Sequence, residues 1–140
     1  MGASIFSAVP RTTVVRGCWR CPFLLHHRKY SPDLRGPLDF EIDSQMPLGM
    51  GVSSSAAIEV ATLRALTAFL SLSWSGTELA RLAQQVENEI VGAPCGLMDH
   101  LTAAHGKPRT LLPILCRPDY LEEPIKLPPG VTVAGERKSF

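Results

Sequence analysis

The hydrophobic and polar positions first form a clear pattern at residues 38–44, where apolar and acidic side chains alternate. A period of two predicts a half-buried β-strand, because successive side chains of a strand point to opposite faces. From Ser54 to about Leu72 the chain becomes almost continuously apolar, with Glu59 among the few interruptions. This stretch predicts a largely buried helix that follows the strand after a short glycine- and serine-rich segment.

A capping box formed by Ser75 and Glu78 predicts the start of a second helix at Gly76. Apolar residues at helical spacing continue this helix to about Val91, where a segment rich in glycine and proline ends it. A short third helix is predicted at residues 97–104. Further strands are expected at residues 110–116, at residues 131–134 and, from a weaker pattern, at residues 120–127. Strand, helices and then strands in one chain predict an α+β or mixed α/β fold.

The chain of 140 residues is long enough for one domain with a sizeable core, and its 45% hydrophobic content is typical of globular proteins. Residues 1–36 are basic and show no sustained period, so a short strand or helix and a poorly ordered solvated segment both stay open. A net charge of +1 gives no argument for nucleic acid or for a membrane surface. Without a membrane-spanning run or a secretory signal pattern, we expect a cytoplasmic protein.

The four cysteines include a C-x-x-C pair, Cys18 and Cys21, which is followed by His26 and His27. Such spacing can indicate a zinc or redox site, but the chain has no second pair and no strand–helix context around this one. We therefore favour free cysteines, because none of them needs to be bridged in a reducing cytoplasm.

The run PLGMGVSSSAA at residues 47–57 joins the predicted strand to the buried helix. Glycine permits a sharp turn and close approach of a ligand, while the amides at a helix N-terminus suit an anion such as phosphate. Serine hydroxyls can cap the helix, donate to phosphate oxygens or ligate magnesium. The run matches neither the P-loop nor the dinucleotide-binding fingerprint. A glycine turn with a serine cap and a phosphate-binding loop therefore both agree with the residues.

Two carboxylates are placed to serve such a loop. Glu87 lies late in the second predicted helix, and Asp99 opens the third. One carboxylate beside bound phosphates can hold magnesium, and a second can orient an acceptor hydroxyl or take its proton. A solvated helix residue and a charge that interacts with the helix dipole are the ordinary alternatives.

The run at residues 47–57 resembles the second motif of the GHMP kinases, and VENEIVGAPCGLMD at residues 86–99 resembles a signature of galactokinases and L-arabinokinases. The resemblance covers roughly residues 38–135. It implies the GHMP kinase N-terminal domain over residues 37–140, an α+β fold like the second domain of ribosomal protein S5. In that fold the core is a strand, a Gly/Ser loop and a buried helix.

The resemblance implies an ATP-dependent transfer of the γ-phosphoryl group to the anomeric hydroxyl of a monosaccharide, L-arabinose or galactose. Ser55 and Glu87 would bind Mg²⁺, Asp99 would be the catalytic group at the sugar hydroxyl, and Gly96 would line the sugar pocket with it. The residues assigned to ATP are Pro47, Gly49, Met50, Gly51, Val52, Ser53, Ser54, Ser55 and Ala56.

Some features depart from the family pattern. His100 stands where the family usually has glutamine, and residues 1–36 contain no recognisable first motif. The third motif and the C-terminal domain would lie beyond Phe140. We therefore expect a partial kinase domain with weak or absent turnover, and exposed apolar surface that favours self-association. The alternative is a non-catalytic remnant or sensor that binds a sugar or a nucleotide.

Overall fold

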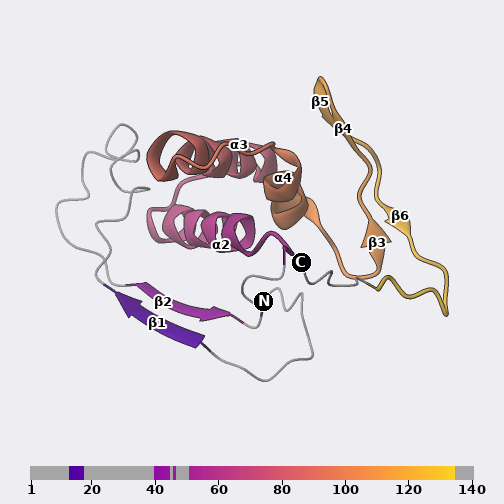
Figure 1. Cartoon of the computed structure of the whole chain (residues 1–140), viewed down its shortest axis with the longest axis horizontal. Helices are drawn as coiled ribbons and strands as arrows, with labels where there is room; N and C mark the ends of the chain where they lie inside the picture. The colour runs from indigo at the N-terminus through magenta and orange to yellow at the C-terminus, as the bar shows by residue number, and fades with distance from the viewer. Residues whose placement is uncertain (1–12, 18–39, 45, 47–50, 135–140) are drawn as a thin grey trace, which may run out of the picture.

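The computed structural model describes residues 13–17, 40–44, 46 and 51–134. Its elements combine a layer of helices with short antiparallel strand pairs (Figure 1). In chain order they are β1 (Thr13–Gly17), β2 (Phe40–Ser44), α2 (Ser54–Phe69), α3 (Gly76–Val86), the π-helical turn η1 (Glu87–Val91), α4 (Met98–His105), β3 (Thr110–Leu111), β4 (Ile114–Cys116), β5 (Asp119–Leu121) and β6 (Ile125–Lys126).

The core lies where α2, α3 and α4 pack together. Each helix contributes apolar residues three or four positions apart, and this spacing places them on one helix face. Leu63 of α2 and Ala80 and Ala83 of α3 are fully buried, and Leu101 of α4 is nearly so. The buried core members are Val60, Leu63, Leu79, Ala80, Leu82, Ala83, Leu97, Leu101 and Ala104.

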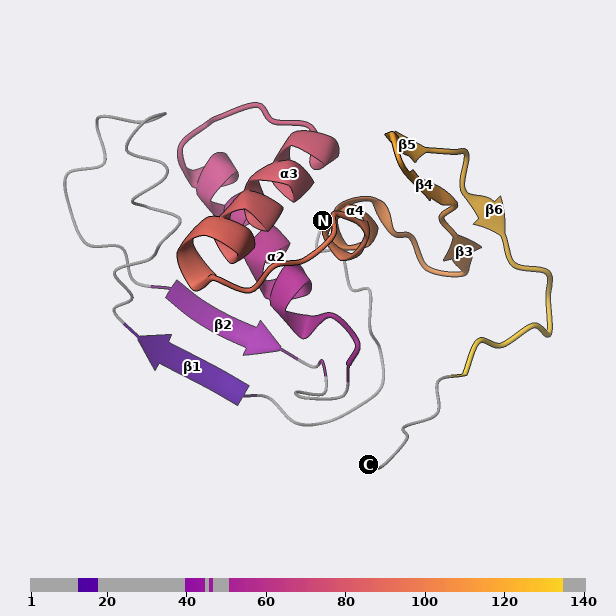
Figure 2. The same ribbon diagram turned by 45° about the horizontal axis from the view of Figure 1, so that its top comes forward.

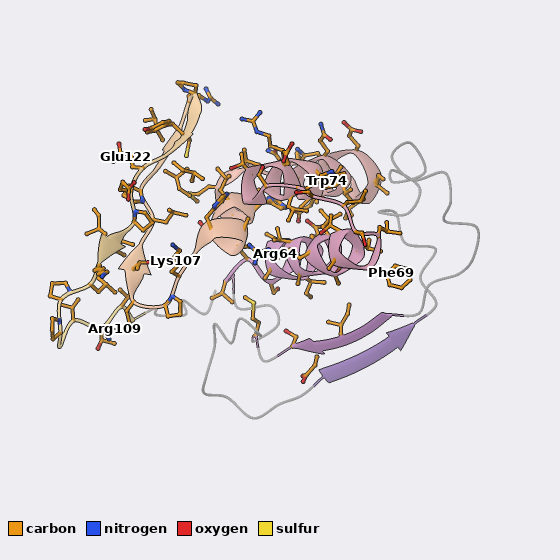
Figure 3. The ribbon with its side chains drawn as sticks, turned by 180° about the vertical axis from the view of Figure 1, so that it is seen from behind. Arg64, Phe69, Trp74, Lys107, Arg109 and Glu122 are labelled. Atoms are coloured by element: carbon orange, nitrogen blue, oxygen red, sulfur yellow. The ribbon has the colours of Figure 1, made fainter. Side chains whose placement is uncertain are left out.

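Two polar contacts fix α4 against the other helices. The Arg64 guanidinium on α2 donates to the carbonyl oxygen of Ala104 near the end of α4, and Figure 3 shows its side chain between the two helices. Thr77 Oγ1 at the start of α3 lies 3.0 Å from Nε2 of His105. A Cβ built on the neighbouring Gly76 would approach the His105 ring to 2.8 Å, so the glycine permits this close contact.

The strands form three separate antiparallel pairs. In the first, β1 and β2 run beside the helical layer, with Thr13 opposite Ser44 and Gly17 opposite Phe40 (Figure 2). The other pairs, β3 with β6 and β4 with β5, form an arm beyond α4. The pairing of β1 with β2 joins residues of the basic segment 1–36 to the first predicted strand. The domain boundary between residues 36 and 37 stays a prediction.

The predicted helices are confirmed with small shifts in their ends. The first ends at Phe69, because Ser71 adopts a left-handed backbone with φ 54° that the helix cannot continue. The second begins at Gly76 with the predicted capping box and reaches Val91 through the π-helical turn. The third spans Met98–His105.

The prediction for the last third of the chain is partly wrong. The expected strand at residues 110–116 is two strands, since Pro113 lies between them and proline cannot donate a ladder hydrogen bond. The weak candidate at 120–127 likewise separates into β5 and β6 around Pro124. Residues 131–134 form no strand, since the turn at Gly130 leaves them without a pairing partner among the described residues.

Large apolar side chains are exposed on the arm. Leu115, Tyr120, Ile125 and Val133 are each more than half exposed. The expectation of exposed apolar surface is therefore confirmed for this part of the chain. None of the helices in the described ranges combines the length and apolarity that a bilayer crossing requires.

Replacing Leu63 by alanine should lower the free energy of unfolding by about 2–5 kcal/mol, because the change leaves a cavity at a fully buried position. Urea denaturation followed by circular dichroism measures this change. Phe69→Ala is the matched control on the same helix. Its side chain is 70% exposed and projects from the far end of α2 (Figure 3), so the loss should stay near 0.5 kcal/mol. Equal losses in the two variants would contradict the assignment of the core.

Glu78 should stabilise α3 in a pH-dependent manner. Its carboxylate accepts hydrogen bonds from the Ser75 hydroxyl and the Ser75 backbone N–H, and these bonds hold its pKa below the ordinary 4.5. The stabilisation is therefore complete above that value and is lost as the pH falls through the lowered pKa. The unfolding free energies of the unsubstituted chain and Glu78→Ala should differ at neutral pH and converge as the pH falls through the lowered pKa of Glu78. A difference that does not change with pH would refute this role.

Candidate functional site

The segment before α2 turns through two residues with a left-handed backbone, Gly51 at φ 69° and Ser53 at φ 55°. Glycine adopts this conformation freely, whereas a serine rarely does. Ser53 occupies the N-cap position, but its side chain makes no capping hydrogen bond, and the first turn of α2 carries no acidic residue. The serine-cap interpretation is therefore wrong for Ser53, and the first-turn amides of α2 lack this usual partner.

The structure places the predicted loop residues unevenly. Pro47, Gly49 and Met50 lie outside the described residues. Gly51, Val52 and Ser55 are exposed, and Ser53 and Ser54 are half-buried. Ala56 is 1% exposed, so its side chain belongs to the core and only its backbone can face a ligand.

A buried polar cluster lies one helical turn further along α2. Glu59 of α2 and Glu87 of η1 both approach the same atom of α4, Nε2 of His100, at 3.0 Å and 3.1 Å. His100 is fully buried, and Glu59 is 8% exposed. Burial of a carboxylate is costly unless it is paired, so these contacts satisfy groups that would otherwise destabilise the fold.

The surroundings of His100 act on its pKa in opposite directions. Burial is the largest single effect and lowers its pKa, but the hydrogen bond to Glu59 opposes it, as do the charges of Glu59 and Glu87. The backbone of Gly96 adds to this opposition, and the pKa of His100 is raised above its ordinary value. His100 and its two carboxylate partners thus join α2, η1 and α4.

The segment after η1 is held through the backbone of Cys95. Its N–H donates to Oδ1 of Asn88 at 2.8 Å, and its carbonyl accepts from Nε2 of Gln84 at 3.1 Å. The Cys95 thiol donates to Oε2 of Glu87 at 3.2 Å. Burial, followed by the hydrogen bond and charge of Glu87, raises the pKa of this thiol to about 11. Cys95 is therefore a protonated thiol at neutral pH, and it belongs to the same cluster as His100.

The remaining predicted residues lie at the edge of this cluster. Asp99 is exposed in the first turn of α4, and its charge contributes to the raised pKa of Cys95. Gly96 is also exposed, and a Cβ built on it would meet no heavy atom within 4 Å. Nothing in the described chain therefore fills the space beside Gly96.

Ser55 lies one helical turn before Glu59, which belongs to the cluster around His100. Ser55 and Glu59 are four residues apart on α2, a spacing that puts them on the same side of the helix. Glu59 contacts His100, which contacts Glu87. The contacts of Glu59 and Glu87 with His100 thus bring α2, η1 and α4 together.

The sequence interpretation assigned no site role to Glu59, Cys95 or His100. Glu59 carried a usable signal, because it is the only acidic residue in a stretch predicted to be buried, and such a carboxylate needs a partner. Cys95 was expected to be an unengaged thiol. Cys95 indeed forms no disulfide, but its thiol is hydrogen-bonded to Glu87.

Comparison with known proteins identifies relatives of two kinds. The chain is 45% identical over 94 residues to the L-arabinokinase of Arabidopsis thaliana. The aligned region covers 67% of this chain and 9% of that protein. It is 47% identical over 100 residues to the galactokinase of Chloroflexus aggregans. Here the aligned region covers 71% of this chain and 25% of that protein. A galactokinase of a Roseiflexus species is 45% identical over 95 residues. No solved structure matches the chain significantly.

The chain thus spans a quarter or less of the length of these relatives. The model of the GHMP kinases N-terminal domain matches residues 14–107, which include β1 from its second residue, β2 and all the described helices. Because this match covers most of the chain, the protein belongs to the GHMP kinase family.

Proposed function

We propose that this chain forms the ATP- and sugar-binding face of a sugar kinase that phosphorylates the anomeric hydroxyl of L-arabinose or galactose. The observation that carries the proposal is the contact of Glu59 and Glu87 with His100, which brings the uncapped start of α2 beside η1 and α4. Relatives named galactokinase and L-arabinokinase support the substrate class. We also propose the fold related to ribosomal protein S5 for the domain.

The start of α2 is suited to hold the phosphates of ATP. Its amides carry the positive end of the helix dipole, and the side chain of Ser53 makes no cap hydrogen bond to them. Gly51, with its positive φ, has no heavy atom within 4 Å of a built Cβ, so phosphate oxygens can approach the backbone there. The same loop includes Pro47, Gly49 and Met50, which lie outside the described residues.

Ser55 and Glu87 offer a hydroxyl and a carboxylate, oxygen donors of the kind that magnesium prefers. Both contacts of Glu87 use Oε2, which leaves Oε1 as the oxygen that we assign to the cation. When bound, Mg²⁺ neutralises negative charge on the phosphate oxygens. Glu87 can therefore bind Mg²⁺ through Oε1 while Oε2 keeps its contacts with His100 and Cys95.

Asp99 is assigned to the acceptor hydroxyl. It is exposed at the start of α4, next to the open space at Gly96 where the sugar would lie. As the hydroxyl oxygen bonds to the γ-phosphorus, Asp99 takes the hydroxyl proton and ADP departs with the electrons of the broken P–O bond. The products are the sugar 1-phosphate and ADP.

Binding of Mg·ATP should weaken when either assigned ligand is removed. Ser55→Ala and Glu87→Gln should each raise the Kd by about tenfold or more, since a lost contact of about 1.4 kcal/mol gives that factor. Isothermal titration calorimetry on the folded chain measures this change. Glu89→Gln is the matched control, since Glu89 is an exposed carboxylate of the same turn η1 without an assigned role. Binding that is equally weak in all three variants would refute the assignment.

Formation of sugar 1-phosphate from L-arabinose or galactose with Mg·ATP should be slow and should depend on Asp99. Asp99→Asn should lower the rate about 10²–10⁴-fold, the usual contribution of a positioned general base. Glu123→Gln, a change at an exposed carboxylate on the arm, should leave the rate unchanged. Mg·ATP binding without any turnover would instead favour a binding or sensor role, and turnover that survives Asp99→Asn would refute the role of Asp99.

A further inference from the structure

Three potential metal donors of three chemical kinds meet where η1 and α4 lie together, and Glu59 of α2 contacts one of them. The donor atoms of Glu87, Cys95 and His100 all lie within 4.8 Å of one another. His100 Nε2 is 3.0 Å from Glu59 Oε2 and 3.1 Å from Glu87 Oε2, and Cys95 Sγ is 3.2 Å from the same oxygen of Glu87. An imidazole, a thiol and a carboxylate thus lie close together, and a second carboxylate contacts the imidazole.

These spacings resemble the edges of a zinc coordination tetrahedron. With bonds of about 2.0 Å to nitrogen and oxygen and about 2.3 Å to sulfur, neighbouring ligand atoms lie roughly 3.3–3.8 Å apart. The three shortest donor separations in the cluster are a few tenths of an ångström below this range. Small side-chain movements would therefore make room for an ion at the centre.

We propose that Glu87, Cys95 and His100 form a binding site for a thiophilic divalent cation such as zinc. Glu59, which contacts His100, would have to move to become a fourth ligand. The mixed nitrogen, sulfur and oxygen donors select zinc over magnesium, which prefers oxygen ligands alone. The site goes beyond the proposed kinase function and does not rest on it. It uses Oε2 of Glu87, whereas Oε1 is assigned to magnesium.

The electrostatics of the cluster favour a cation. Besides burial, the negative charges of Glu87, Glu59 and Asp99 raise the pKa of the Cys95 thiol to about 11, because they oppose formation of a thiolate. The same charges attract a divalent ion, whose bond to sulfur takes the place of the thiol proton. Binding thus forms the metal–sulfur bond and releases the proton of Cys95, and that of His100 when it is present, to solvent.

The second ring nitrogen of His100, Nδ1, is buried near the backbone of Gly96. Ligating imidazoles are usually oriented by a polar group that faces the other ring nitrogen. The Nδ1 atom of His100 is buried without a well-aligned hydrogen bond in the described residues, yet the backbone of Gly96 is close enough to raise the pKa of the ring. A small rotation would align these groups when Nε2 binds the ion.

The test uses Co²⁺ as a spectroscopic substitute for zinc and the full chain with Cys18, Cys21 and Cys116 replaced by serine. Cys95 is then the only cysteine, so a sulfur-to-cobalt charge-transfer band can come from no other thiol. We expect this band to saturate at one equivalent of Co²⁺. One equivalent of Zn²⁺ should abolish it, whereas excess Mg²⁺ should leave it in place.

In this background, His100→Gln and Glu87→Gln should weaken Co²⁺ binding by more than the roughly 10–100-fold that loss of an outer-sphere partner costs. Glu89→Gln is the matched control and should bind like the parent. His100→Gln introduces the residue usual in the family, and circular dichroism verifies that each variant is folded. Absence of the band, or a band that neither substitution weakens, would overturn the proposal. Because no ATP or sugar is present, either result is independent of the kinase assays.

Discussion

Burial of His100 between Glu59 and Glu87 is the constraint on which the arrangement of this domain depends. Each of the three residues comes from a different element, so their contact fixes α2, η1 and α4 relative to one another. Such contacts cost desolvation, and loss of His100 would leave both carboxylates without this partner. The packing of α2, η1 and α4 therefore depends on these three side chains.

The apolar core makes this polar contact possible. Leu63, Leu101 and Ala83 exclude water between the helices and bring their backbones close enough for side-chain contact. At the opposite end of α4, Arg64 binds the carbonyl of Ala104, so that α4 is attached to α2 at both ends. The helical layer thus serves as a rigid support, while the exposed residues at its edge remain free to face ligands.

Local patterns predicted the helical part of the fold well, because capping and apolar spacing act over a few residues. The Ser75–Glu78 box placed the start of α3 correctly, and the buried stretch identified α2. The arm was harder to predict, since Pro113 and Pro124 interrupt runs whose composition still resembles strands. The site was predicted only from motifs. The contact of Glu59 with His100 joins residues 41 positions apart, and no local pattern specifies such a contact.

The π-helical turn places a strict limit on chain length in this region. A π-helical turn holds one residue more than the α-helical turn it replaces, and each residue of an α-helix advances the direction of a side chain by about 100°. Loss of one residue from Glu87–Val91 would restore α-helical geometry and rotate everything that follows. Asn88 could then no longer accept from the Cys95 amide as it does at 2.8 Å. Substitutions at the exposed residues Glu89, Ile90 and Val91 are thus far easier to accommodate than a single deletion, and homologous chains should keep the length of the turn even where these side chains differ.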